Sequence, residues 1–160
     1  LQDPYGIEFW PEFKGRDGCR TPMVWHKRAL NGGFTNGTPW LPIWPAHLAL
    51  APDCEEGEPA SLLHHYRRAI KLRHDHKALQ AGLMTDLAAE DTVLRFTRSL
   101  DSEEILCLFN LAEGPVTAKL PAGDWTYLAA DLGGAAPLDG AVTLGAWQCA
   151  ILLRNGGRNG

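Results

Sequence analysis

The chain has 160 residues, of which 45% are hydrophobic and 21% are charged, with a net charge of -4 and a pI near 5.8. This composition is ordinary for a globular protein and argues against general disorder. The acidic balance excludes the basic face typical of nucleic-acid-binding proteins, and no apolar run is long enough to cross a bilayer. We therefore predict no nucleic acid and no membrane as partners. Because the chain begins at Leu1 without a leader pattern, we expect a processed product or a fragment.

Residues 1–53 form a region rich in proline and tryptophan that keeps neither a helical nor a strand period. The prolines interrupt any helix, and Asn31-Gly32-Gly33 and Asn36-Gly37 mark turns. Disordered segments are poor in aromatic residues, whereas this one holds four of the six tryptophans, Trp10, Trp25, Trp40 and Trp44. Since long ordered loops are usually functional, we predict an ordered loop with a function.

A helix is predicted over residues 58–75. Leu62, Tyr66 and Ile70 recur at helical spacing, and basic residues gather toward the C-terminal end, where the helix dipole favours positive charge. Pro59 suits the first turn of this helix, which should end before Ala81-Gly82.

From residue 83 to 153 the pattern changes to short β-compatible runs separated by turn signals. The predicted strands are 93–97, 105–109, 116–120, 125–128, 142–144 and 149–153. The turn signals are Asp101-Ser102, Glu113-Gly114-Pro115, Ala122-Gly123-Asp124, Gly133-Gly134 and Asp139-Gly140. This alternation favours a small antiparallel β-sandwich, and residues 155–160 should form a flexible tail.

The cysteines predict neither a zinc site nor a disulfide framework, because Cys19, Cys54, Cys107 and Cys149 are widely spaced and form no CxxC pair. Cys107 and Cys149 lie inside apolar runs. We interpret both as buried free thiols, which fits a reducing cytoplasm and predicts a cytoplasmic location.

The histidines give little support for a metal site. His64-His65 are adjacent, and His74 and His76 are two apart, whereas ligand pairs on one helix face are four apart. Nothing in the pattern supplies the remaining ligands of such a site. We therefore predict no metal and no cofactor in this segment.

Two motifs of the first region resemble the α-amylase superfamily. Residues 14–25 (KGRDGCRTPMVW) are similar to the segment after the last barrel strand in its α-glucosidases and oligo-1,6-glucosidases, and residues 33–42 (GFTNGTPWLP) are similar to the next landmark. Residues 2–6 (QDPYG) resemble the version in proteobacterial α-glucosidases. The chain thus resembles the C-terminal portion of a bacterial α-glucosidase of glycoside hydrolase family 13.

The resemblance implies an α+β fragment in which the last loop and helix of a (β/α)8 barrel are followed by a C-terminal antiparallel β-sandwich. Residues 1–80 would be the end of the catalytic barrel, with the loop after strand 8 and helix 8. Residues 81–154 would be the all-β domain, followed by the tail. In such barrels the active site lies at the face where these loops emerge.

The activity implied is that of a retaining α-glucosidase, which hydrolyses and can transfer terminal α-linked glucose from di- and oligosaccharides. Retaining hydrolysis needs two carboxyl groups about 5 to 5.5 Å apart. The family's motifs for these groups are absent here, so we assign no catalytic residue in this segment. The expected partners are glucosides, short α-glucans and the remainder of the enzyme, the upstream barrel.

Arg16 is the residue to which the resemblance gives a substrate-binding role. In the family, the arginine of the Gly-Arg-Asp triplet reaches the pocket that holds the non-reducing glucose, together with an aspartate from an early loop. A guanidinium has donors in a rigid fork, which suits a carboxylate and a sugar hydroxyl together. Asp17 and Arg20 are interpreted instead as an internal brace of the loop.

Other functions stay open. One is a related enzyme, such as an oligo-1,6-glucosidase, a sucrose isomerase or a trehalose synthase. Another is a stand-alone carbohydrate-binding β-sandwich module, but such a module should expose aromatic residues on its sandwich, and the tryptophans cluster in the loop region. We expect Trp25, Trp40 and Trp44 to pack beneath the loop rather than to stack on sugars.

Overall fold

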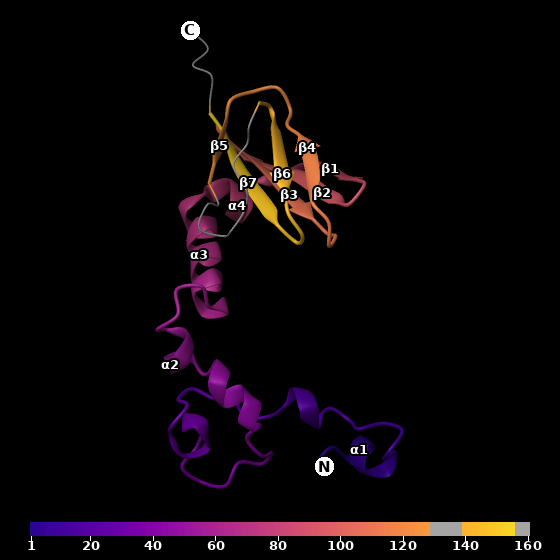
Figure 1. Cartoon of the computed structure of the whole chain (residues 1–160), viewed down its shortest axis with the longest axis vertical. Coiled ribbons are helices and arrows are strands. Elements are labelled where there is room, and N and C mark those ends of the chain that lie inside the picture. The colour runs from indigo at the N-terminus through magenta and orange to yellow at the C-terminus, as the bar shows by residue number, and fades with distance from the viewer. Residues whose placement is uncertain (129–138, 156–160) are drawn as a thin grey trace. The chain divides into compact units, whose positions relative to one another are not determined.

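The computed structural model describes residues 1–128 and 139–155. The described residues divide into two compact units, one of residues 1–64 and one that begins at residue 65. The first unit consists of irregular chain with short helices (Figure 1). These are α1 (Pro4–Glu8), α2 (Pro52–Glu55) and three 3-10 helices at Asp17–Cys19, Leu30–Gly33 and Pro45–Leu50. Proline occupies the start of α1, of α2 and of the third 3-10 helix. Prolines therefore begin short helices here and prevent longer ones.

The predicted turn at Asn31-Gly32-Gly33 is present. Asn31 and Gly32 have positive φ angles of 49° and 61°, and the backbone N–H groups of Trp25 and His26 both donate to the Gly32 carbonyl. A Cβ on Gly32 would lie 2.7 Å from Val24 Cγ1. Glycine is therefore needed here both for its φ angle and for the close approach of Val24.

The long helix begins later than predicted. It is α3 (Leu62–Asp75), and Pro59 lies before it, so the prediction that Pro59 occupies the first turn is wrong. Side chains cap the helix instead, since Ser61 Oγ accepts from the His64 N–H at 3.3 Å and Glu55 Oε2 accepts from the Leu63 N–H at 3.0 Å. A short helix, α4 (Lys77–Ala81), follows a break at His76.

The second unit contains two antiparallel sheets (Figure 1). The larger sheet has the strand order β1-β2-β3-β7-β5, and the smaller one pairs β4 with β6. The strands are β1 (Leu83–Glu90), β2 (Val93–Leu100), β3 (Glu103–Asn110), β4 (Val116–Lys119), β5 (Trp125–Tyr127), β6 (Ala141–Leu144) and β7 (Cys149–Arg154). All six predicted strands are confirmed, and β1 was missed.

The missed strand has a sequence that disfavours strands and a position that tolerates this. β1 holds Asp86, Ala88, Ala89 and Glu90, which are residue types depleted in strands. It is an edge strand with a bulge between Thr85 and Ala88 in its pairing with β2. Pairing with β2, rather than its own propensity, therefore specifies β1.

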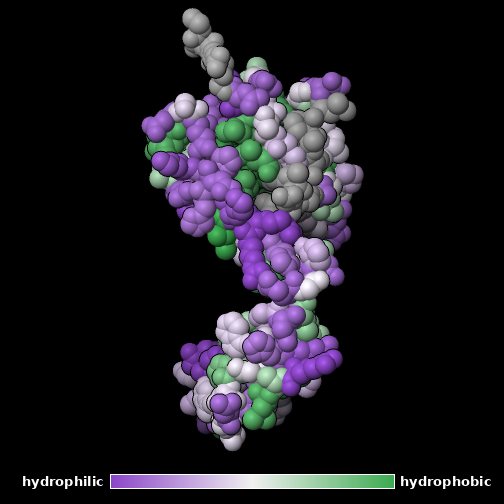
Figure 2. Space-filling view, turned by 90° about the vertical axis from the view of Figure 1, so that its left-hand side faces the viewer, coloured by the Kyte–Doolittle hydropathy of each residue, from purple (hydrophilic) through white to green (hydrophobic). Residues whose placement is uncertain are grey.

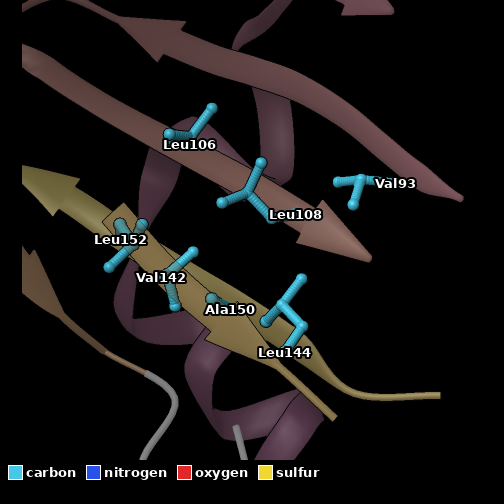
Figure 3. Packing of buried hydrophobic residues seen from close by; sticks show 7 residues of the cluster. All are labelled: Val93, Leu106, Leu108, Val142, Leu144, Ala150 and Leu152. Carbon is cyan, nitrogen blue, oxygen red and sulfur yellow. The ribbon is translucent and has the colours of Figure 1, made fainter. Parts of the chain in front are cut away.

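The central strand, β3, contributes to two cores because successive side chains point to opposite faces of the sheet. Leu106 and Leu108 pack with Val93, Ala150 and Leu152 of the larger sheet and with Val142 and Leu144 of β6 (Figure 3). On the other face, Ile105 and Cys107 pack with Ala78 of α4 and Ile151. The predicted fold class, an α+β fragment ending in an antiparallel sandwich, is confirmed.

The two apolar-run cysteines differ in burial. Cys107 is buried and Cys149 is half-buried, so the prediction of buried thiols holds fully only for Cys107. Burial raises the pKa of the Cys107 thiol to about 12. Both are free, as are Cys19 and Cys54.

Within residues 1–128 and 139–155, no helix is long and apolar enough to cross a membrane. The predicted Gly133-Gly134 turn and residues 156–160 of the predicted tail lie outside the described residues.

The burial pattern predicts which leucines stabilise the sandwich. Leu108 is 1% exposed in the core, whereas Leu87 on β1 is 64% exposed. We expect Leu108→Ala to lower the free energy of unfolding by about 2 to 5 kcal/mol, because it leaves a cavity. The control Leu87→Ala should change it by less than about 0.5 kcal/mol. Urea denaturation followed by circular dichroism measures both, and equal losses would contradict the assignment of the core.

Candidate functional site

The centre of the first unit is a buried carboxylate, that of Asp3. Its side chain is inaccessible to solvent, at 0% exposure for the residue. One carboxylate oxygen, Oδ2, accepts hydrogen bonds from the Arg16 backbone N–H at 2.7 Å and from Arg16 Nε at 3.2 Å. The other, Oδ1, accepts from the Tyr5 N–H at 3.2 Å and so caps α1. Asp3 therefore ties the first helix to the Gly-Arg-Asp motif.

Gly15 lets this approach happen. Its φ angle is 70°, in the left-handed region that favours glycine, and a Cβ there would lie 2.9 Å from both Cβ and Oδ2 of Asp3. A side chain at this position would separate the Arg16 backbone N–H from the carboxylate. The first residue of the Gly-Arg-Asp triplet is thus explained by local geometry.

Asp17 and Arg20 complete the group of four charged residues that we call the Asp3 cluster: Asp3, Arg16, Asp17 and Arg20. Asp17 Oδ2 accepts from the backbone N–H groups of Gln2 at 2.5 Å and of Asp3 at 3.1 Å. Arg20 Nη2 lies 2.8 Å from Asp17 Oδ1 and 3.5 Å from Asp3 Oδ2. The interpretation of Asp17 and Arg20 as an internal brace of the loop is confirmed by these contacts.

The Arg16 side chain is hydrogen-bonded through Nε, but most of it is exposed to solvent. Its side chain is 67% exposed although its Nε pairs with the buried Asp3. Among the residues that the structure describes, its Nη1 and Nη2 atoms make no hydrogen bond or ion pair. The guanidinium thus presents its outer donors to solvent on a backbone that Asp3 fixes.

Both buried carboxylates of the cluster have lowered pKa values. The Arg16 backbone N–H, followed by the Arg16 side chain, lowers the pKa of Asp3 below its ordinary value of 3.8 and outweighs burial. The Gln2 N–H is the largest cause of the lowered pKa of Asp17, again against the effect of burial. Hydrogen bonds to the ionised form explain both directions. Asp3 and Asp17 are therefore carboxylates, not acids, near neutral pH.

The tryptophans are not packed beneath the loop. Trp25, Trp40 and Trp44 are 49%, 59% and 59% exposed, so the prediction of packing within this unit is wrong. The Arg20 guanidinium lies over the Trp40 ring, 5.1 Å from the ring centroid. Arg20 therefore links the Asp3 cluster to the second family-like motif through a cation–π contact.

Two of the histidines considered as metal ligands, His64 and His76, have other partners. His64 Nε2 lies 3.0 Å from the Glu56 carbonyl, and His76 Nδ1 lies 2.6 Å from Glu103 Oε1. In residues 1–128 and 139–155 no three histidine, cysteine or acidic side chains gather as metal ligands would.

Sequence reasoning missed Asp3, the residue on which the site depends. A local signal was present, because Asp directly before Pro4 is typical of a helix N-cap. That signal places the side chain at the start of α1, but it does not reveal the contact with Arg16, which is 13 residues away.

Comparison with protein families decides the membership of the chain. The family described as alpha amylase, catalytic domain, matches residues 2–82, which include the whole Asp3 cluster. The chain belongs to the α-amylase family. A second family, a domain of unknown function (DUF3459), matches residues 82–151, the region of the antiparallel sheets.

Curated relatives of this α-amylase family member are named as glucosidases. A probable alpha-glucosidase of Rhizobium meliloti (strain 1021) is 50% identical over 121 residues, which are 76% of this chain and 22% of the relative. An oligo-1,6-glucosidase of Parageobacillus thermoglucosidasius is 35% identical over 122 residues, 75% of this chain and 21% of the relative. The chain thus spans about a fifth of the length of the curated relatives that it matches.

Among solved structures, the crystal structure of an alpha-glucosyl transfer enzyme, XgtA, superposes with a TM-score of 0.85 at 37% sequence identity. The match covers 97% of this chain and 29% of XgtA.

The geometry at Gly15 predicts a strong local effect of one methyl group. We expect Gly15→Ala to destabilise the first unit by about 1 to 3 kcal/mol, since alanine must adopt a positive φ and would collide with Asp3. The control is Gly18→Ala in the same loop, where a Cβ would meet nothing within 4 Å. Thermal unfolding compares the two variants, and equal stability would contradict the close approach of Asp3.

The lowered pKa of Asp3 predicts a pH dependence. The hydrogen bonds that Asp3 accepts should persist fully above its ordinary pKa of 3.8 and disappear only as the pH falls through the lower folded value. The chemical shift of the Arg16 amide proton, followed by NMR between pH 6 and pH 2, should therefore have a midpoint below 3.8. A midpoint above that value would show that burial outweighs the hydrogen bonds.

Proposed function

We propose that the chain is the C-terminal portion of a retaining α-glucosidase that hydrolyses, and can transfer, terminal α-linked glucose from di- and oligosaccharides. The observation that carries the proposal is the exposed Arg16 guanidinium, anchored by Asp3 within the part that matches the catalytic domain. The names of the 50%-identical and 35%-identical relatives support glucosidase activity. The name of XgtA supports glucosyl transfer.

Arg16 would contribute substrate binding rather than bond cleavage. Its free Nη donors suit the hydroxyl groups of a terminal glucose and a carboxylate supplied by the rest of the barrel. A fixed cation at the closed end of the glucose pocket would favour release of one terminal residue over cleavage within a longer chain. This role requires a guanidinium of fixed direction, which the Asp3 contact provides.

The acidic residues of the cluster are unsuited to the catalytic roles. Asp3 and Asp17 are 0% and 7% exposed, so neither can touch a substrate. Both have lowered pKa values, whereas a general acid needs a pKa near or above the working pH. We therefore propose that the nucleophile and the acid/base lie in the upstream barrel.

The proposal of a longer enzyme also explains the apolar surface of the first unit. Large apolar side chains are exposed there, among them Tyr5, Phe9, Trp10, Trp40 and Trp44. Figure 2 shows hydrophobic areas on the mainly hydrophilic surface of both units. Patches of this kind mark interaction surfaces. The upstream barrel would cover part of this surface, so the tryptophans would pack against residues outside the chain.

A stand-alone carbohydrate-binding sandwich is less well supported. Of the tryptophans in the sandwich, Trp125 donates its Nε1–H to the Pro121 carbonyl and has the Arg154 guanidinium over its ring at 5.7 Å. Its ring is therefore occupied rather than free for a sugar, and only Trp147 is well exposed. The four free cysteines support a cytoplasmic location, which we also propose. That this segment holds no cofactor stays a separate proposal.

The experiment that tests the proposal uses the complete enzyme. Arg16→Ala should lower kcat/KM for an aryl α-glucoside roughly 100-fold, because charged hydrogen bonds to the sugar are lost. The matched control is Arg28→Ala, which removes an exposed arginine of the same unit. If Arg16→Ala leaves the kinetics unchanged, the substrate-binding role of Arg16 is wrong. If residues 1–160 alone cleave the glucoside, the proposal that the nucleophile and the acid/base lie in the upstream barrel is wrong.

A further inference from the structure

We propose that Asp3 is a positioning residue for substrate binding, because it fixes the direction of the Arg16 guanidinium without touching the substrate itself. This inference rests on the proposed substrate-binding role of Arg16. It concerns a residue that lies in the family-like stretch 2–6 but to which the resemblance gave no role.

Asp3 and Arg16 are joined by two hydrogen bonds that share one acceptor oxygen. The backbone N–H and the side-chain Nε of Arg16 both donate to the same oxygen, Asp3 Oδ2, at 2.7 and 3.2 Å. Two donors from one residue that meet at one acceptor fix the side chain relative to its own backbone. Because the guanidinium is planar, holding Nε also sets the directions of the Nη donors.

The anchor itself cannot move freely. The Asp3 backbone N–H donates to Asp17 Oδ2 at 3.1 Å, and Asp3 Oδ1 accepts from the Tyr5 N–H. The Asp3 carbonyl accepts from the Ile7 N–H at 3.0 Å within α1. Both ends of Asp3 are therefore fixed, and its carboxylate is a buried, rigid acceptor.

This arrangement has a consequence for binding. An exposed arginine normally samples many rotamers, and a ligand must oppose that entropy when it orders the side chain. Arg16 is 67% exposed yet anchored at Nε, so part of this ordering is present before the substrate arrives. Loss of the Asp3 charge should free the guanidinium, and both productive binding and turnover should then fall.

A double-mutant cycle in the complete enzyme tests this role, with wild type, Asp3→Asn, Arg16→Ala and the double variant assayed on an aryl α-glucoside. We expect Asp3→Asn to lower kcat/KM about tenfold, since a neutral amide replaces a charge-assisted acceptor. In the Arg16→Ala background the same change should have almost no further effect, because the side chain through which Asp3 acts is gone.

The matched control is Asp53→Asn. Asp53 also lies in the first unit and accepts a backbone N–H, that of Lys27, with both oxygens at 3.1 Å, but it does not contact Arg16. Its replacement should leave kcat/KM unchanged. If Asp3→Asn lowers activity by the same factor with and without Arg16, Asp3 is merely structural and the proposal is wrong. If Arg16→Ala leaves kcat/KM unchanged, the substrate-binding role of Arg16 is wrong. If Arg16→Ala lowers kcat/KM but Asp3→Asn does not, only the positioning role of Asp3 is wrong.

A second measurement applies where Asp3→Asn does not fold. Added guanidinium should restore part of the activity of Arg16→Ala, because the Asp3 carboxylate still offers a site for a planar cation, and neutral urea of the same shape should not. Rescue by guanidinium alone supports the proposal. Absent rescue, or equal rescue by urea, contradicts it.

Discussion

The first unit depends on one buried carboxylate. Asp3 accepts hydrogen bonds from Tyr5 and Arg16, and Asp17 fixes its backbone. The apolar core available to this unit is small: among its described residues the buried hydrophobic side chains are those of Val24, Leu41 and Ala51. Apolar burial within the unit is therefore limited, and charge-assisted hydrogen bonds to backbone N–H groups add to it.

The second unit follows the opposite principle. Its central strand, β3, is apolar on both faces, with Leu106 and Leu108 in one core and Ile105 and Cys107 in the other. Removal of such groups from water is the dominant stabilising term in folding. The chain thus combines a sandwich held by apolar packing with a loop region held by ions, and the candidate site lies in the latter.

These two kinds of stabilisation explain how much the sequence predicted. The six strands with β-branched and aromatic residues were predicted correctly because pattern and burial agree there. Strand β1 was missed because its pairing with β2, a contact distant in sequence, overrides a poor propensity. The helix start was misplaced because the capping groups come from Ser61 and Glu55 rather than from Pro59.

At the candidate site, Arg16 came from the family resemblance and the brace between Asp17 and Arg20 came from the charge pattern. Asp3 could not be predicted from spacing, because its partner Arg16 is 13 residues away across irregular chain. The tryptophans were misread for a different reason. Burial was inferred for each ring from residue type alone, whereas Trp25, Trp40 and Trp44 are exposed among the residues that the structure describes.

The three residues of the Gly-Arg-Asp triplet have complementary roles around the Asp3 carboxylate. Gly15 supplies a positive φ and the space for Asp3, so the Arg16 N–H reaches the carboxylate. Asp17 accepts hydrogen bonds from the N–H groups of Gln2 and Asp3, and these bonds keep the Asp3 carboxylate in place. Between them, Arg16 is the one member whose polar end faces solvent, with 67% of its side chain exposed. Gly15 and Asp17, which flank Arg16, therefore have the same effect. They keep the backbone and Nε of Arg16 in place, while its Nη donors face solvent.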